Sequence, residues 1–282
     1  MATPTPDRRS AWTSIFLYLA IVTAMSAAFH FALVRIQPSS FYVGALMWCP
    51  AIAAFLTLFL TGRRLGDLPW RWGAARFHWG AWLVPVLYVG GAYALIWGLG
   101  LGGVPNPETL AQWAGETGLS GLSPAALIAA SIALIGTVSF IRAMATIVGE
   151  EIGWRGFLIF EMRKVMPFGA TALASGLIWA FWHWPIVVFY GGGDPWIQMT
   201  AFTVTITAMS VVMTYFTFKA NSLWPAVIFH ASHNIYAQKV FDPLTVETAR
   251  SAPWTGEFGI MIPLVAIPIA FWFWRRAKAE GL

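Results

Sequence analysis

The stretch Val148–Gly156, which reads VGEEIGWRG, indicates the character of the whole chain, because it places charged side chains inside a long apolar segment. Two adjacent carboxylates, Glu150 and Glu151, are followed closely by the guanidinium of Arg155. Ionisable side chains at membrane depth are costly, so they mark functional sites by default. The first question is therefore whether the chain around them is built to cross a membrane.

The composition favours an all-α membrane protein. Of the 282 residues, 58% are hydrophobic and only 10% are charged, whereas a soluble domain carries about 25% charged residues. A helix that crosses a bilayer needs roughly 20 consecutive apolar residues. We expect a polytopic fold of about eight transmembrane helices, at residues 11–34, 41–61, 77–102, 123–165, 168–190, 196–218, 221–238 and 258–274.

The distribution of basic residues predicts the topology. With the N-terminus in the cytoplasm, most arginines and lysines fall in loops on that side, and most acidic residues fall in the opposite loops. We therefore expect cytoplasmic tails at 1–10 and 275–282, with one membrane domain at 11–274. The formal charge of +5 reflects this bias and does not indicate nucleic-acid binding. The first apolar stretch is long enough to be a retained helix, not a cleaved signal peptide.

The fourth segment is unusually long. Ser123 and Pro124 form a helix start, with a capping side chain followed by proline at the first helical position. The segment then runs to residue 165 without a further proline, about 65 Å at 1.5 Å per residue. It must bend, tilt or protrude, and Gly136 and Gly149 are candidate bend points. Whether it forms one bent helix or two is open.

The charged cluster on this segment suggests a division of roles. Glu151 and Arg155 are four residues apart, so they share a helix face and are spaced to pair. Glu150 is rotated about 100° away from that face. We expect one neutralised carboxylate that supports the site and one freer carboxylate that reacts. A purely structural ion network between helices would have the same sequence pattern.

Two further polar clusters occur in later spans. His183 lies in the aromatic stretch at 179–185, and His230 is followed by His233 and Asn234. His230 and Asn234 are four residues apart and share a face. Taken singly, each cluster also fits a hydrogen-bonded core histidine or a polar seam between helices. His233 is the second choice for the active histidine of its cluster.

Depth counting brings the three clusters into one layer. Glu150 lies 17 residues before Pro167, and His183 lies 16 residues after it, so an antiparallel hairpin at Pro167 would bring both to one level. His230 lies 11 residues beyond Lys219, which places it about 16 Å from the expected cytoplasmic surface. We therefore expect one polar layer in the cytoplasmic half, open to substrate from the cytoplasm or laterally from lipid.

The order and spacing of these residues resemble the CPBP family of intramembrane proteases, which is related to CAAX prenyl-protein endopeptidases and bacteriocin-immunity proteins. The resemblance rests on Glu150-Glu151-x-x-x-Arg155, then His183, then His230-x-x-x-Asn234, within residues 123–240. One position departs from the family. The residue four before the second-motif histidine is usually phenylalanine, and here it is Trp179, which can fill the same packing role.

The resemblance implies roles for these residues and a protease core at 123–240. Glu150 and His183 would activate the attacking water, His230 and Asn234 would stabilise the oxyanion, and Glu151 with Arg155 would support the site. It implies a membrane-associated protein or peptide substrate in a bacterial or archaeal cell membrane. Two histidines and a glutamate match a catalytic zinc ligand set, so zinc bound by Glu150, His183 and His230 stays an open alternative. No HExxH pattern is present, and the resemblance does not require a metal.

Two other classes of function use similar residues. A non-enzymatic immunity or binding protein would keep the polar core as a scaffold. A proton-coupled transporter would use buried glutamate, histidine and asparagine as an ion relay. The transporter is less favoured, because the chain lacks a repeated pair of broken hydrophobic segments in two halves.

Overall fold

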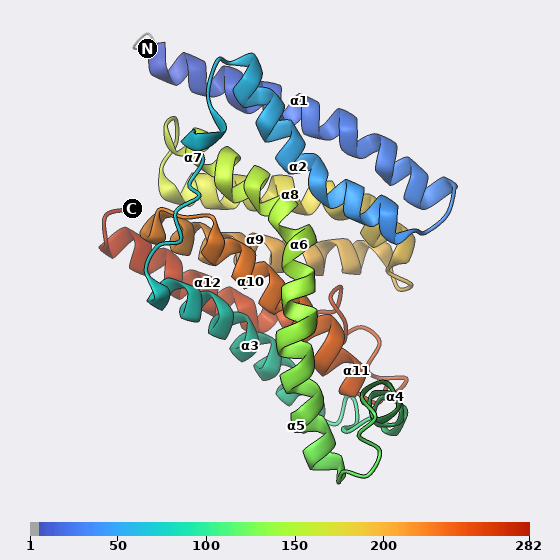
Figure 1. Cartoon of the computed structure of the whole chain (residues 1–282). Helices are drawn as coiled ribbons and strands as arrows, with labels where there is room; N and C mark the ends of the chain where they lie inside the picture. Colours follow the sequence, from blue (N-terminus) through green and yellow to red (C-terminus); the bar gives the residue numbers. More distant parts are fainter. Residues whose placement is uncertain (1–5) are drawn as a thin grey trace.

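A computed structural model of the chain describes residues 6–282, and this part is helical throughout, with no strand among the described residues. Six long helices run alongside one another in Figure 1. They are α1 (Pro6–Arg35), α2 (Ser40–Leu60), α3 (Ala75–Gly98), α8 (Phe168–Tyr190), α9 (Pro195–Ala220) and α12 (Met261–Ala279). The all-α polytopic fold expected from composition is confirmed.

Within residues 6–282, six helical segments are long and apolar enough to cross a membrane. They match the first six expected spans, and they run Arg8–Arg35, Ser40–Leu60, Ala75–Gly98, Pro124–Arg163, Phe168–Tyr190 and Pro195–Ala220. The seventh expected span corresponds to α10 (Trp224–Ile235), which continues through η4 (Tyr236–Phe241) into α11 (Asp242–Leu244). The eighth corresponds to α12. Because both carry more polar or charged residues, a total of eight crossings stays a prediction.

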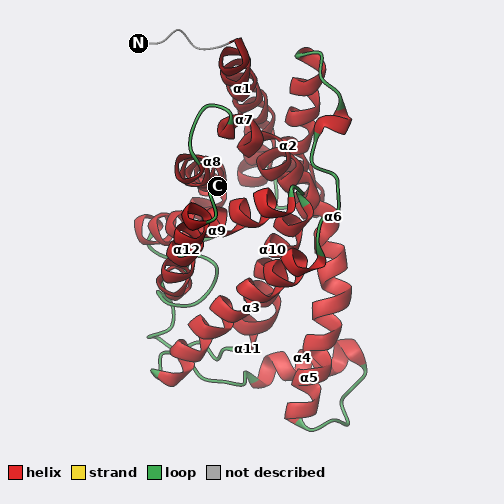
Figure 2. Cartoon of the chain, turned by 90° about the vertical axis from the view of Figure 1, so that its left-hand side faces the viewer, coloured by secondary structure: helices red, strands yellow, loops and turns green. Residues whose placement is uncertain are grey.

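The fourth expected span is a single helical run with two π-helical segments. It comprises α5 (Pro124–Leu134), η2 (Ile135–Ser139), α6 (Phe140–Glu151), η3 (Ile152–Leu158) and α7 (Ile159–Arg163). The Ser123 hydroxyl caps its start by accepting a hydrogen bond from the backbone N–H of Ala126. The α5–α6 part crosses the other long helices steeply, and the run changes direction near η3 (Figures 1 and 2). π-Helical insertions are a recognised cause of such bends.

Two glycines let this helix approach α2 closely. A Cβ atom on Gly149 would lie 2.8 Å from the backbone oxygen of Met47, and one on Gly153 would lie 2.5 Å from Pro50. Small residues four apart allow membrane helices to pack backbone to backbone. Gly149, a candidate bend point in the sequence, thus lies at a helix–helix contact immediately before the two glutamates.

Segments expected in the cytoplasm meet at one end of the bundle. Arg63, after α2, is 2.6 Å from Glu161 near the end of α7, and Glu161 also pairs with Lys164 at 2.9 Å. Arg8 donates a hydrogen bond to the backbone oxygen of Val165 at 3.0 Å. The end of α12 lies at this end too (Figure 1). The expected tail at 1–10 is helical from Pro6 onward, and residues 1–5 lie outside the described residues.

The helix α4 (Pro107–Thr117) lies in an expected outer loop and was not predicted from the sequence. Asn106 caps it by accepting a hydrogen bond from the Glu108 N–H. Trp113 of α4 belongs to a small apolar cluster with Tyr236, Val240 and Leu244. This cluster anchors the outer end of η4, which continues the helix that carries His230 and Asn234.

Candidate active site

Side chains from α6, α8 and α10 line one cavity of about 400 Å³. All four candidate catalytic residues contribute to its wall, namely Glu150, His183, His230 and Asn234. His233 lines it as well. The two supporting candidates, Glu151 and Arg155, lie behind the wall and are fully buried. The structure therefore brings together all the residues of the three sequence clusters.

Glu151 pairs with Arg155, as their spacing predicts, and also with a partner that the sequence did not indicate. Its Oε1 atom lies 3.3 Å from Nη1 of Arg155 and 2.9 Å from Nδ1 of His230. The guanidinium of Arg155 also lies 4.0 Å from the centre of the Trp179 ring, in cation–π geometry. Glu151 therefore ties α6 to α10 while sharing its charge with Arg155.

Glu150 faces the cavity and is held by Trp179. The indole Nε1–H of Trp179 donates a hydrogen bond of 2.8 Å to Oε2 of Glu150. Among residues 6–282, Oε1 of Glu150 has no hydrogen-bond partner. One carboxylate oxygen is thus fixed, and the other is left for a water molecule or a substrate.

The hydrogen bonding of His183 determines its neutral tautomer. Its Nδ1 atom lies 3.0 Å from the backbone oxygen of Trp179. Because a carbonyl oxygen only accepts, Nδ1 carries the proton, and Nε2 is the unprotonated nitrogen of the neutral ring. His183 can therefore accept a proton or a water hydrogen bond through Nε2.

His230 and His233 both border the cavity but have different partners. His230 contacts Glu151 through Nδ1 and packs edge-on against Trp179, with ring centroids 5.0 Å apart. His233 is linked instead to the hydroxyl of Tyr88, 2.6 Å from its Nδ1. Its Nε2 is buried without a partner in the described part of the chain. Only His230 is connected to the glutamate–arginine pair.

Trp179 contacts four of the site residues. It donates a hydrogen bond to Glu150, accepts one from His183 through its backbone oxygen, and packs against the guanidinium of Arg155 and the ring of His230. From the sequence, Trp179 was expected only to pack in place of phenylalanine. Its hydrogen bond to Glu150 could have been predicted, because a tryptophan, unlike a phenylalanine, carries an N–H that needs an acceptor when it is buried.

Two further polar side chains, Gln238 and Glu257, line the same cavity and were not singled out in the sequence. The amide of Gln238 donates a hydrogen bond of 2.8 Å to Oε2 of Glu257. Glu257 lies in the loop before α12, and burial raises the pKa of its carboxyl group. No sequence motif predicts that Glu257 lines the cavity, because its loop is brought there by the packing of helices that are distant in the sequence.

The exposed part of the cavity wall lies at the end of the bundle away from the start of α1. It includes Pro38, Val43, Tyr190 and Gln238. A separate pocket at the opposite end, around Arg63 and Glu161, contains none of the candidate site residues. Substrate access from the cytoplasm or laterally from lipid stays a prediction.

The three proposed zinc ligands do not form a metal site as arranged. No group of three or more His, Cys, Asp or Glu side chains in residues 6–282 is positioned to hold a metal ion. Glu150, His183 and His230 each have one polar atom bound to protein, which would leave Oε1 and the two Nε2 atoms as donors. The donor types suit zinc, but their positions do not fit it.

Comparison with known proteins gives one family match. Residues 125–236 match the family model described as type II CAAX prenyl endopeptidase Rce1-like. A search of curated proteins finds no match. The matched range begins at the start of α5 and ends just beyond Asn234, so it contains the whole set of candidate site residues. The match covers less than half of the chain, and it agrees with the resemblance to CAAX-type intramembrane proteases that the three motifs carry.

Proposed function

We propose that this protein is an intramembrane endopeptidase that hydrolyses a peptide bond of a membrane-associated protein or peptide. The observation that carries the proposal is the convergence of Glu150, His183, His230 and Asn234 on one cavity. Peptide hydrolysis needs a base for water and donors for the developing oxyanion. Residue types suited to both tasks border one cavity of about 400 Å³.

In the proposed mechanism, a water molecule lies between Oε1 of Glu150 and Nε2 of His183. Glu150 takes one of its protons, and the hydroxyl oxygen attacks the carbonyl carbon of the substrate. The resulting tetrahedral oxyanion accepts hydrogen bonds from the N–H groups of His230 and Asn234. Collapse breaks the C–N bond, and the proton held by Glu150 passes to the leaving nitrogen. The carboxylate is thereby regenerated, so the protons balance.

The bond between His230 and Glu151 supports the oxyanion role. If Nδ1 of His230 donates to Glu151, then Nε2 can donate to an oxyanion only when the ring is a doubly protonated imidazolium. A carboxylate at 2.9 Å favours that charged form. Arg155 then holds Glu151 in position from the other side. In this proposal Glu151 and Arg155 act through His230 and do not touch the substrate.

The decisive experiment measures peptide cleavage by purified protein in liposomes. Glu150→Gln keeps the size of the side chain and an acceptor for Trp179 but removes the base, so turnover should fall by about 10²-fold or more. Glu161→Gln is the matched control, because Glu161 is also buried but pairs with Arg63 and Lys164 outside the cavity. It should retain turnover.

The same variants distinguish the other classes of function. Full turnover by Glu150→Gln would overturn the catalytic assignment. If the protein has no peptidase activity and a binding or immunity phenotype survives Glu150→Gln, the site is a scaffold. Proton flux that depends on Glu150, measured in the same liposomes with a pH-sensitive dye, would identify a transporter. The bacterial or archaeal membrane stays a prediction of the family resemblance.

A further inference from the structure

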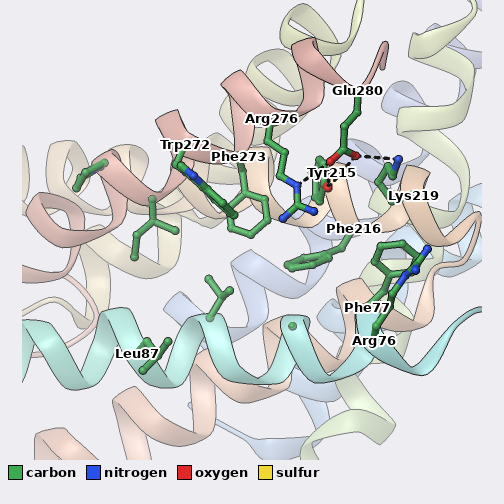
Figure 3. A pocket seen from close by; sticks show the side chains of 14 residues that line it. Arg76, Phe77, Leu87, Tyr215, Phe216, Lys219, Trp272, Phe273, Arg276 and Glu280 are labelled. Atoms are coloured by element: carbon green, nitrogen blue, oxygen red, sulfur yellow. Dashed lines mark hydrogen bonds and ion pairs between the residues drawn. The ribbon is translucent and has the colours of Figure 1, made fainter.

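A second, larger cavity lies outside the candidate active site. It has a volume of about 790 Å³ and is formed between α3, α9 and α12. Figure 3 shows α3 and α12 as two facing walls, with side chains of α9 between them. None of the candidate catalytic residues lines it. It therefore needs an explanation of its own.

One end of this groove is basic. Arg76 lies in the first turn of α3, Lys219 lies in the last turn of α9, and Arg276 lies in the last turn of α12. Glu280 is the only acidic residue in the lining. Glu280 forms ion pairs with two of these cations: its carboxylate oxygens lie 2.7 Å from Nε of Arg276 and 2.8 Å from Nζ of Lys219. Three cations against one carboxylate leave two positive charges. These residues gather at the same end of the groove in Figure 3.

Several donors at the basic end remain free. Within residues 6–282, Arg76 makes no ion pair and lies against the ring of Phe77. Arg276 uses only Nε in hydrogen bonding, so both of its Nη groups are available. Arg276 and Lys219 hold the pKa of Glu280 at about 2. Glu280 is therefore ionised at neutral pH and keeps the two cations in place without neutralising Arg76.

The rest of the groove is apolar and has the depth of one leaflet. Arg76 and Leu87, at its two ends on α3, are 11 residues apart, or about 16 Å at 1.5 Å per residue. This is close to half of the hydrocarbon thickness of about 30 Å. Leu87 is 60% exposed and Trp272 is 54% exposed, so the groove is open to the surrounding lipid along its length.

We propose that this groove binds one anionic phospholipid of the cytoplasmic leaflet. The phosphate would lie between Arg76 and Arg276, and an acyl chain would run along Phe77, Val84 and Leu87. The charge fits, because basic pockets between helices on the cytoplasmic side select anionic headgroups. The terminal positions of all three cations put them at the height of the headgroups. The proposal is independent of peptide cleavage and is tested without measuring it.

The test compares lipid binding by the purified full-length protein in detergent, using native mass spectrometry. The probes are dioleoyl phosphatidylglycerol and dioleoyl phosphatidylcholine, which have equal chains but differ in headgroup charge. Phosphatidylglycerol should bind more tightly, and Arg76→Gln with Arg276→Gln should weaken it by about tenfold or more. The control is Arg275→Gln with Lys278→Gln, an equal loss of charge at residues that do not line the groove. The control should retain binding.

Three results would overturn the proposal. They are equal binding of the two lipids, phosphatidylglycerol binding that survives Arg76→Gln with Arg276→Gln, and equal weakening by the control pair. Because Arg276 pairs with Glu280, the double variant is also checked by thermal unfolding. If it does not fold, Arg76→Gln alone carries the test, since Arg76 has no ion pair to lose. Val84→Phe, which narrows the groove at constant charge, should weaken phosphatidylglycerol binding too.

Discussion

The Nδ1 atom of His230 lies 2.9 Å from Oε1 of Glu151, so a residue on α10 is fixed to a residue on α6 across the helix interface. This contact orients the histidine ring and leaves its Nε2 for the cavity. It also gives Glu151 two cationic or potentially cationic neighbours, because Arg155 binds the same oxygen. The two adjacent glutamates consequently differ in environment: one is held by α10, and the other borders the cavity.

The difference between the two glutamates predicts how substitutions affect stability. Arg155 and Glu151 are both fully buried. The substitution Arg155→Ala therefore removes the positive charge that balances the buried carboxylate of Glu151. The expected cost is about 3–5 kcal/mol. Glu150→Gln removes a charge without orphaning a cation and should cost less. Thermal unfolding in detergent measures both. Equal melting temperatures would contradict the proposed division of roles.

The two histidines of α10 can be separated by activity. His230→Ala removes the proposed oxyanion donor, and turnover should fall by about 10²–10³-fold. His233→Ala is the matched control, because it removes a buried histidine from the same cavity but breaks only the contact with Tyr88. It should cost less than about tenfold. The reverse ranking, with His233→Ala inactive and His230→Ala active, would reassign the active histidine.

Trp179→Phe tests whether the indole N–H does more than fill space. The substitution keeps an aromatic ring beside Arg155 and His230 but removes the donor to Glu150. A lost hydrogen bond to a charged group is worth about 1.5–3 kcal/mol. We expect turnover to fall by about tenfold or more while KM changes little. Trp182→Phe is the control, because its N–H donates to Ser26 and not to a candidate catalytic residue. If both substitutions lowered turnover equally, the hydrogen bond from Trp179 to Glu150 would have no specific role, and Trp179 would act only by packing.

The sequence was informative where local chemistry decides the structure. The serine–proline start and the lack of later prolines predicted the helical run from Pro124, which ends at Arg163. The four-residue spacing of Glu151 and Arg155 predicted their pair. Asn106 and Pro107 repeat the same capping signal, but the short α4 that follows was missed because its surroundings are polar and resemble a loop.

Contacts between helices could not be read from the sequence. The bond from Glu151 to His230 joins residues 79 positions apart, and nothing in either motif specifies it. The direction of the cavity is a similar case. Counting residues predicted that the candidate site residues share one layer, and they line one cavity, but the exposed wall residues of that cavity come from segments that no motif singled out. The roles of the individual site residues stay predictions.

Metal content provides the last test, because the zinc-bound and metal-free mechanisms predict different outcomes. Glu150, His183 and His230 offer suitable donor types, yet they do not form a ligand group in the structure. We therefore expect active protein to contain well under one zinc per chain and to keep its turnover after chelation and dialysis. Elemental analysis and activity are measured on the same sample, with Glu150→Gln as a blank for adventitious metal. A zinc ion bound close to one per chain, lost with activity on chelation and regained with it, would contradict the metal-free mechanism. His183→Ala would then lower zinc content as well as turnover, whereas His233→Ala would leave the zinc in place.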